Sequence, residues 1–225
     1  YAPQSKEDSD IFNRFQMNGI KFVQTWGGCV YHMTCRGSRR NTIDKAKNIY
    51  EDSPEWLAQN QISSRNFIRK WGHFVKHDQF MKPIIPSKYD MGFIIKNPNL
   101  QLIDALEPWC STMYCNDQIS DNTSKLNGTK LVNDMVVHYI KTQTTSYDLH
   151  EKIKPYDNEK KNGILVEIDG ANFTQQDFDY VTKLPEVIDN QIETLEQELM
   201  HHSDYSEFEL GNLYITIINL KTFEK

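Results

Sequence analysis

Two prolines, Pro83 and Pro86, interrupt the chain and separate two regions that differ in charge. Proline cannot continue a helix or donate to a central strand, so two prolines this close together indicate a linker. Of the 225 residues, those up to 85 include 13 basic and 8 acidic side chains, whereas residues 86–225 include 12 basic and 23 acidic. The sequence therefore predicts two domains that meet at residue 85, each large enough to bury its own core.

Composition excludes several classes of protein. A chain with 38% hydrophobic and 25% charged residues is neither disordered nor fibrous. No apolar run approaches the ~20 residues that a membrane-spanning helix needs, so we expect no membrane span. The chain starts at Tyr1 with no secretory signal, and we expect a piece of a longer cytoplasmic protein. Four cysteines without a C-x-x-C pair are expected to be reduced and mostly buried: Cys29, Cys35, Cys110 and Cys115.

Hydrophobic periodicity predicts the secondary structure of both regions. In the first region we expect a helix from Glu7 to Met17, strands at 21–26 and 29–32, and helices at 43–50, from Pro54, and at 64–77. In the second we expect strands at 89–95, 111–115 and 163–169, helices at 100–106, 131–141, 174–185 and 187–200, and a closing hairpin over 208–220. A strand, helix, strand order that occurs twice favours a small α+β sandwich with helices on one face of a sheet.

The acidic start of the first helix is the first candidate for chemistry. Glu7 and Asp8 lie in its first turn, where the free N–H groups and the helix dipole stabilise a carboxylate as the anion. Such a group is suited to accept a proton as a general base. Asp10 and Arg14 are four residues apart and can form an ion pair along one helix face. The alternative is a run of acids that only caps a surface helix.

The arginines are the second candidate, because all six lie in the first third of the chain. The guanidinium group matches phosphate oxygens with a rigid pair of donors. The segment Arg36-Gly37-Ser38-Arg39-Arg40 therefore predicts a phosphate-bearing ligand, and a solvated basic face is the alternative. We expect no nucleic acid partner, since the acidic second region would repel a long polyanion.

The order of these motifs resembles the closing part of the catalytic domain in family 2 glycosyltransferases of the GT-A fold. That family has an E-D-x-D helix start, an arginine four residues on, a Gly-x-Lys step into a strand, a strand ending in histidine, and an F-x-x-K-W-G segment downstream. The matching residues here are Glu7, Asp8, Asp10, Arg14, Gly19, Lys21, His32, Phe67, Lys70, Trp71 and Gly72.

The resemblance implies a fold, an activity and a role for each matching residue. Residues 1–85 would be the tail of a GT-A domain, in a chain of mixed α/β and α+β class. Asp8 would be the general base that deprotonates an acceptor hydroxyl, and Glu7 would orient the acceptor. His32 would bind a divalent metal, Mn²⁺ or Mg²⁺. The diphosphate of a nucleotide-sugar donor would be held by basic and hydroxyl side chains, namely Arg36, Ser38, Arg39 and Arg40.

One departure from the family pattern limits this expectation. The family's D-x-D metal motif and nucleotide-binding strands precede the acidic helix by many tens of residues, and only six residues precede it here. We therefore expect this chain alone to be inactive and to act as part of a longer enzyme. Residues 86–225 are expected to be an accessory domain with a packing, binding or oligomerising role. Two other hypotheses stay open: a non-enzymatic interaction module, and a metal-dependent phosphotransferase or nuclease that uses His32, Asp8 and the arginines.

Overall fold

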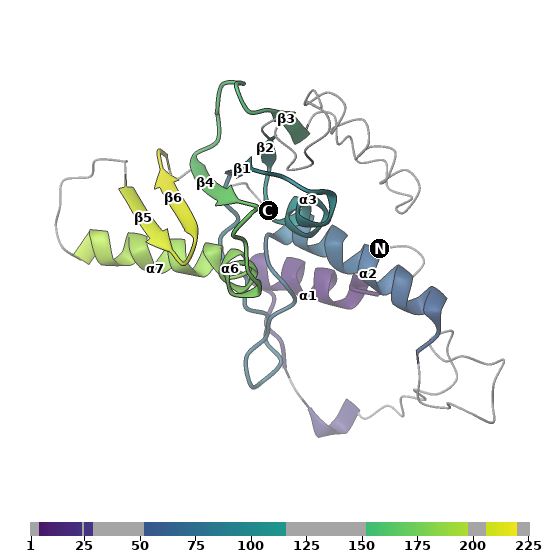
Figure 1. The fold of residues 1–225 in the computed structure, drawn as a ribbon. Coiled ribbons are helices and arrows are strands. Elements are labelled where there is room, and N and C mark those ends of the chain that lie inside the picture. The colour runs from purple at the N-terminus through teal and green to yellow at the C-terminus, as the bar shows by residue number, and fades with distance from the viewer. Residues whose placement is uncertain (1–4, 24, 29–51, 116–151, 198–205, 220–225) are drawn as a thin grey trace. The chain divides into compact units, whose positions relative to one another are not determined.

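The computed structural model describes residues 5–23, 25–28, 52–115, 152–197 and 206–219. The chain divides into two compact units, Tyr1–Lys70 with Phe74–Ile85 and Trp71–His73 with Pro86–Lys225, and each is described by itself. Figure 1 traces their helices and strands. Among the described helices, none is both long and apolar enough to cross a membrane.

The first unit is built on two α-helices, α1 (Glu7–Met17) and α2 (Pro54–Trp71), and a short 3-10 helix, η1 (Trp26–Gly28). The predicted helix from Glu7 to Met17 is confirmed. At the start of α2, the Ser53 hydroxyl accepts a hydrogen bond from the Trp56 backbone N–H at 3.2 Å, and Pro54 takes the first helical position.

Three predicted elements of the first unit differ from the structure: the helix from Pro54, the helix over 64–77 and the strand over 21–26. The two helices expected from Pro54 and over 64–77 are one continuous helix, and it ends at Trp71 because Gly72 has a φ of 81°. The strand expected at 21–26 is not formed at residues 21–23 and 25, and Trp26 begins η1. The Phe22 ring instead packs on α1, edge to face with Phe12 at 5.5 Å. The strand expected at 29–32 and the helix expected at 43–50 lie outside the described residues.

The second unit contains a six-stranded, mostly parallel sheet in the order β3-β2-β1-β4-β6-β5. β1 pairs in parallel with both β2 and β4, and β2 pairs in parallel with β3. β6 is antiparallel to its neighbours β4 and β5. The strand bounds are β1 Met91–Lys96, β2 Thr112–Cys115, β3 Ile153–Pro155, β4 Ile164–Asp169, β5 Ser206–Leu210 and β6 Leu213–Ile217.

Helices connect these strands, as parallel pairing requires. Between β1 and β2 the chain forms α3 (Leu100–Leu106) and η2 (Glu107–Trp109); between β4 and β5 it forms α6 (Gln175–Val181) and α7 (Leu184–Gln197). Asn99 caps α3, and Thr174 caps α6 in a capping box with Asp177. The predicted bounds of α3 and the Thr174 cap are confirmed.

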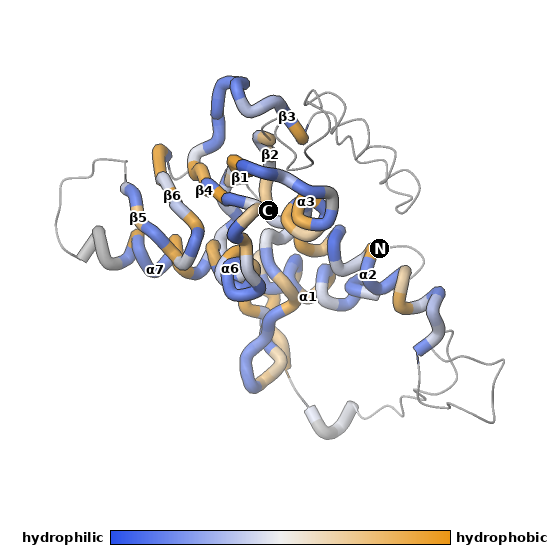
Figure 2. Tube along the Cα trace, in the orientation of Figure 1, coloured by the Kyte–Doolittle hydropathy of each residue, from blue (hydrophilic) through white to orange (hydrophobic). Residues whose placement is uncertain are grey.

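The core of the second unit lies around β1, in which five consecutive residues are buried. A strand buried on both faces is typical of the middle of a parallel sheet, whereas β4 and β6 alternate between buried and half-buried side chains. Figure 2 shows hydrophobic residues along β1, β4 and α3. The side chains with almost no exposure include Phe93, Ile95, Ile103, Leu106, Met113, Ile153, Ile164, Ile168 and Leu184.

A small polar network crosses the sheet beside Gly92. The Asn162 amide donates to Asp90 Oδ1 at 2.7 Å and accepts from the Tyr114 hydroxyl at 2.9 Å. A Cβ on Gly92 would lie 2.5 Å from Asn162 Oδ1, so only glycine leaves room for this network.

The fold of the second unit is thus mixed α/β, with helices between parallel strands. The sequence predicted helices packed on a sheet, but it did not predict that the neighbouring strands β3, β2, β1 and β4 pair in parallel. The predicted helix at 131–141 lies outside the described residues.

Candidate active site

The start of α1 has an unusual backbone. Ser5 and Lys6, just before the helix, both lie in the left-handed region, with φ of 83° and 74°. For residues other than glycine this conformation costs on the order of 1 kcal/mol or more, and it is found preferentially at functional sites. Lys6 makes no side-chain cap, while Glu7, Asp8 and Asp10 give the first turn three carboxylates.

Asp10 forms ion pairs with basic side chains of both helices. Its carboxylate is only 6% exposed and accepts from Arg14 Nε at 2.9 Å, which confirms the predicted ion pair. It also forms an ion pair with Lys70 Nζ near the end of α2. A buried carboxylate held by two partners has a structural role, because it fixes α1 against α2.

Asp8 lies on the surface and lines a groove of about 520 Å³. Grooves of about 300 to 1,000 Å³ commonly hold small-molecule ligands. Glu7 is exposed too but does not line this groove. The groove is lined by Asp8, Ser9, Phe12, Asn13, Phe22, Val23, Val75, Lys76, His77, Phe80, Met81 and Pro83.

The groove wall opposite α1 is a short hairpin-like loop. The Asp78 backbone N–H donates to the Lys82 carbonyl at 2.9 Å, and Ile84 N–H donates to the Lys76 carbonyl at 3.1 Å. The Asp78 side chain accepts two further backbone hydrogen bonds, from Phe80 at 2.8 Å and from Lys82 at 2.9 Å. These bonds hold Phe80 and Met81 at the tip of the loop, with both side chains exposed.

Asn13 carries the only buried amide nitrogen without a hydrogen-bond partner in the part of the chain that the structure describes. The side chain is 4% exposed and lines the same groove as Asp8. Leaving a buried donor unpaired costs about 1 to 3 kcal/mol, so Asn13 is a destabilising polar group beside the groove. Sequence reasoning missed this residue; the only signal was an asparagine in the interior of an amphipathic helix.

A second groove of about 550 Å³ adjoins the first. The two share Phe22, Val23 and Phe80, and the second adds Lys21 and Lys82 to its lining. The first groove is therefore mostly apolar and opens toward a more basic one.

Five of the predicted site residues cannot be placed. His32, Arg36, Ser38, Arg39 and Arg40 lie outside the described residues. Within the ranges that are described, no three His, Cys, Asp or Glu side chains come together to hold a metal ion. Of the predicted site residues, the structure describes two. Asp8 lines the groove, and Glu7 is exposed and does not line it.

The sequence also predicts a turn at Asp169-Gly170, and at His73 and His77 either a helical metal site or an exposed helix end, and the structure describes both places. Asp169, at the end of β4, accepts from the Asn97 amide at 2.8 Å and from the Ala171 backbone at 3.0 Å, and these hydrogen bonds lower the pKa of its carboxyl. It forms a turn, as the sequence predicts. His73 is buried and His77 is exposed, and neither lies on a helix, since α2 ends at Trp71.

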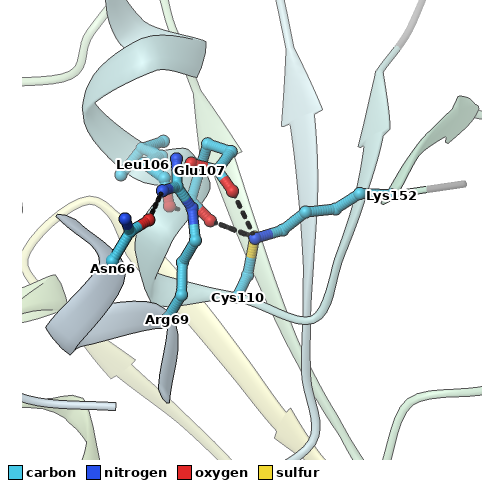
Figure 3. Close-up of polar contacts among 6 residues, drawn as sticks. All are labelled: Asn66, Arg69, Leu106, Glu107, Cys110 and Lys152. Atoms are coloured by element: carbon cyan, nitrogen blue, oxygen red, sulfur yellow. Dashed lines mark hydrogen bonds and ion pairs between the residues drawn. The ribbon is translucent and has the colours of Figure 1, made fainter. Parts of the chain in front are cut away.

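The second unit contains a buried ion pair that the sequence did not reveal. Lys152 Nζ lies 2.8 Å from Glu107 Oε1, and both side chains are almost fully buried (Figure 3). The Cys110 thiol lies against the Leu106 and Glu107 carbonyls. Burial raises the pKa of Cys110 to about 12, so this thiol is a structural group and not a nucleophile.

Comparisons with family models, with curated proteins and with solved structures found no match to this chain.

Proposed function

We propose that this chain is part of a metal-dependent glycosyltransferase that moves a sugar from a nucleotide-sugar donor to an acceptor hydroxyl. The first unit would be the tail of a GT-A domain, as its resemblance to family 2 glycosyltransferases implies. The observation that carries the proposal is the groove on α1, where Asp8 and Asn13, whose buried amide nitrogen is unpaired, line a space of ligand size.

Among the three carboxylates of the first turn, Asp8 is the best candidate for the base. Asp10 is buried against Arg14 and Lys70 and cannot approach a ligand without losing them. Glu7 does not line the groove. Asp8 alone combines exposure with a place in the groove wall.

The proposed reaction uses Asp8 as the general base. An acceptor hydroxyl in the groove transfers its proton to the Asp8 carboxylate as its oxygen attacks the anomeric carbon of the donor. The bond from that carbon to the nucleotide diphosphate breaks, and the diphosphate leaves with the electron pair. Base catalysis of this kind contributes a factor of about 10² to 10⁴ in rate. The segment with Arg36, Ser38, Arg39 and Arg40 would offset the charge of the leaving group, and the metal at His32 would do the same.

The test of this proposal uses the full-length protein that contains the chain. Release of nucleoside diphosphate from a panel of sugar nucleotides should require Mn²⁺ or Mg²⁺ and should rise when an acceptor is added. No release from any donor, or metal-dependent cleavage of nucleic acid or phosphoesters in its place, would reject the transferase and favour a phosphotransferase or nuclease.

A second candidate function is a non-enzymatic interaction module. It is favoured by the number of apolar side chains exposed on the first unit, because large apolar patches commonly mark protein interaction sites. These side chains are Ile11, Phe12, Phe15, Met17, Ile20 and Val23. Self-association in analytical ultracentrifugation that is lost in a Phe15→Ser variant, together with no turnover of any donor, would support this function.

A further inference from the structure

We infer that the acceptor of this site is amphipathic: a sugar head group that carries the reacting hydroxyl, joined to an apolar body. The Asn13 amide would donate a hydrogen bond to the head group, and the aromatic wall of the groove would hold the body. The inference rests on the proposed function, because it names the substrate class of the same groove.

The polar end of the groove is formed by α1. Asp8, Phe12 and Asn13 lie within two turns of this helix and line the groove together. Asn13 Nδ2 is a buried donor with no partner in the described part of the protein, whereas oxygen acceptors are what a sugar presents at each of its carbons. A side-chain rotation that turns this amide toward the groove would let it donate to a sugar oxygen and orient the ring toward the Asp8 carboxylate.

Much of the remaining wall is apolar and exposed, although Ser9, Lys76 and His77 also line the groove. Val23 is 82% exposed, Phe80 65% and Met81 63%, although such side chains are normally covered. They line the groove with Phe12 and Phe22, and no sugar hydroxyl could hydrogen-bond to any of them. A saccharide could stack the C–H faces of its rings on the phenylalanine side chains but would lose hydration beside Val23 and Met81, whereas an alkyl or aromatic body would gain about 0.8 kcal/mol for each CH₂ group it buries.

The loop that carries Phe80 and Met81 is held in place for this role. Asp78 fixes the loop through its two side-chain hydrogen bonds to the backbone of Phe80 and Lys82. Met81 has a φ of 62°, a conformation that is strained for a residue other than glycine. The backbone therefore maintains two apolar side chains on the surface beside the groove.

The experiment is a titration of the ¹⁵N-labelled chain, followed by NMR, with no donor and no metal. The probes are octyl, phenyl and methyl glycosides of glucose, galactose and N-acetylglucosamine, each kept below its critical micelle concentration. The readout is the side-chain NH₂ resonance of Asn13, assigned by its loss in the Asn13→Ala variant. Asn18, an exposed asparagine of the same helix, serves as the control for both the resonance and the substitution.

The octyl or phenyl glycoside of at least one sugar should shift the Asn13 resonance saturably, bind at least tenfold more tightly than the methyl glycoside, and leave Asn18 unchanged. A stronger response to octyl than to phenyl would identify an aliphatic body, and the reverse an aromatic one. The Asn13→Ala variant should bind about threefold to tenfold more weakly and Asn18→Ala as the unsubstituted chain does. No saturable shift with any probe, or equal affinity for methyl and octyl glycosides, would overturn the inference.

If Asn13→Ala does not fold, triple-resonance spectra of the unsubstituted chain assign the Asn13 resonance, and the wild-type titration alone then decides between the outcomes. The outcome is also distinct from that of the transferase assay. Binding that follows these predictions without turnover of any donor would reject the proposed function alone. Turnover that depends on Asp8, together with an unshifted Asn13 resonance, would reject this inference alone.

Discussion

Lys70 of α2 forms an ion pair with Asp10 of α1, although 60 positions separate the two residues in sequence. The pair joins the acidic start of α1 to the C-terminal part of α2 within the first unit. Asp10 is therefore the residue that holds the helix, which leaves the neighbouring Asp8 available to the groove.

Replacing Lys70 with Met should destabilise the first unit by about 1 to 3 kcal/mol, because the buried Asp10 carboxylate loses a charged partner. Urea unfolding followed by circular dichroism measures the change. Lys82→Met, at an exposed lysine of the same unit, is the control and should have little effect. If Asp10→Asn and Lys70→Met had additive effects in a double-mutant cycle, the two side chains would not be coupled.

In the second unit, replacing both members of the buried Glu107–Lys152 ion pair should destabilise the fold less than replacing either one alone. Glu107→Leu or Lys152→Met alone should cost about 3 to 5 kcal/mol, since each removes the ion-pair partner of a buried charge. The double variant removes both charges and should be more stable than either single variant. Lys161→Met breaks a fully solvated pair with Glu159 and serves as the control. A double variant as unstable as the sum of the two single variants would contradict this account.

Asp177 should make the second unit sensitive to acid. Burial tends to raise the pKa of its carboxyl, but donation from the Asn212 backbone and amide and from Thr174 outweighs burial and lowers the pKa to about 2. The unfolded chain has an aspartate pKa near about 3.9, so it binds this proton more readily than the folded chain does. The stabilisation is therefore complete above about pH 4 to 5 and is lost as the pH falls toward about 2.

Unfolding measured at several pH values checks this prediction. The difference in stability between the unsubstituted chain and Asp177→Asn should narrow as the pH falls from 5 to about 2. Asp179→Asn, at an exposed residue of the same helix, should show no such trend. A difference that stays constant over this pH range would mean that the Asp177 carboxyl is not stabilised as the anion.

Cys110 and Cys115 should resist alkylation in the folded protein. Burial raises the pKa of each thiol to about 12, so almost no thiolate is present at pH 8. Peptide mapping after iodoacetamide treatment should find both unmodified until urea is added. Rapid modification of either cysteine without urea would show that the strand β2 or the turn before it opens readily.

Local patterns predicted much of the secondary structure. The bounds of α1 follow from its apolar spacing and the stop at Gly19, which has a φ of 68°. The end of α2 was misjudged, although Gly72 carried the signal. The sheet order was out of reach because β1 pairs with β4, about 70 residues away, and such pairing leaves no local signature.

The candidate site was predictable only where a motif marked it. The acidic helix start drew attention to Asp8, and the structure places that residue in a groove. Asn13 has no motif, since its importance arises from burial without a partner, and burial depends on the residues that pack around it. Lys152 gave no signal for the same reason: a buried lysine is rare, and its partner Glu107 is 45 residues away.

The role of Asp8 is the central claim, and a comparison of Asp8→Asn with Glu7→Gln in the full-length protein tests it most directly. Both residues are exposed in the same helical turn, and only Asp8 lines the groove. Sugar transfer should fall about 10² to 10⁴-fold in Asp8→Asn with donor affinity unchanged, and much less in Glu7→Gln. Full transfer activity in Asp8→Asn would contradict the account.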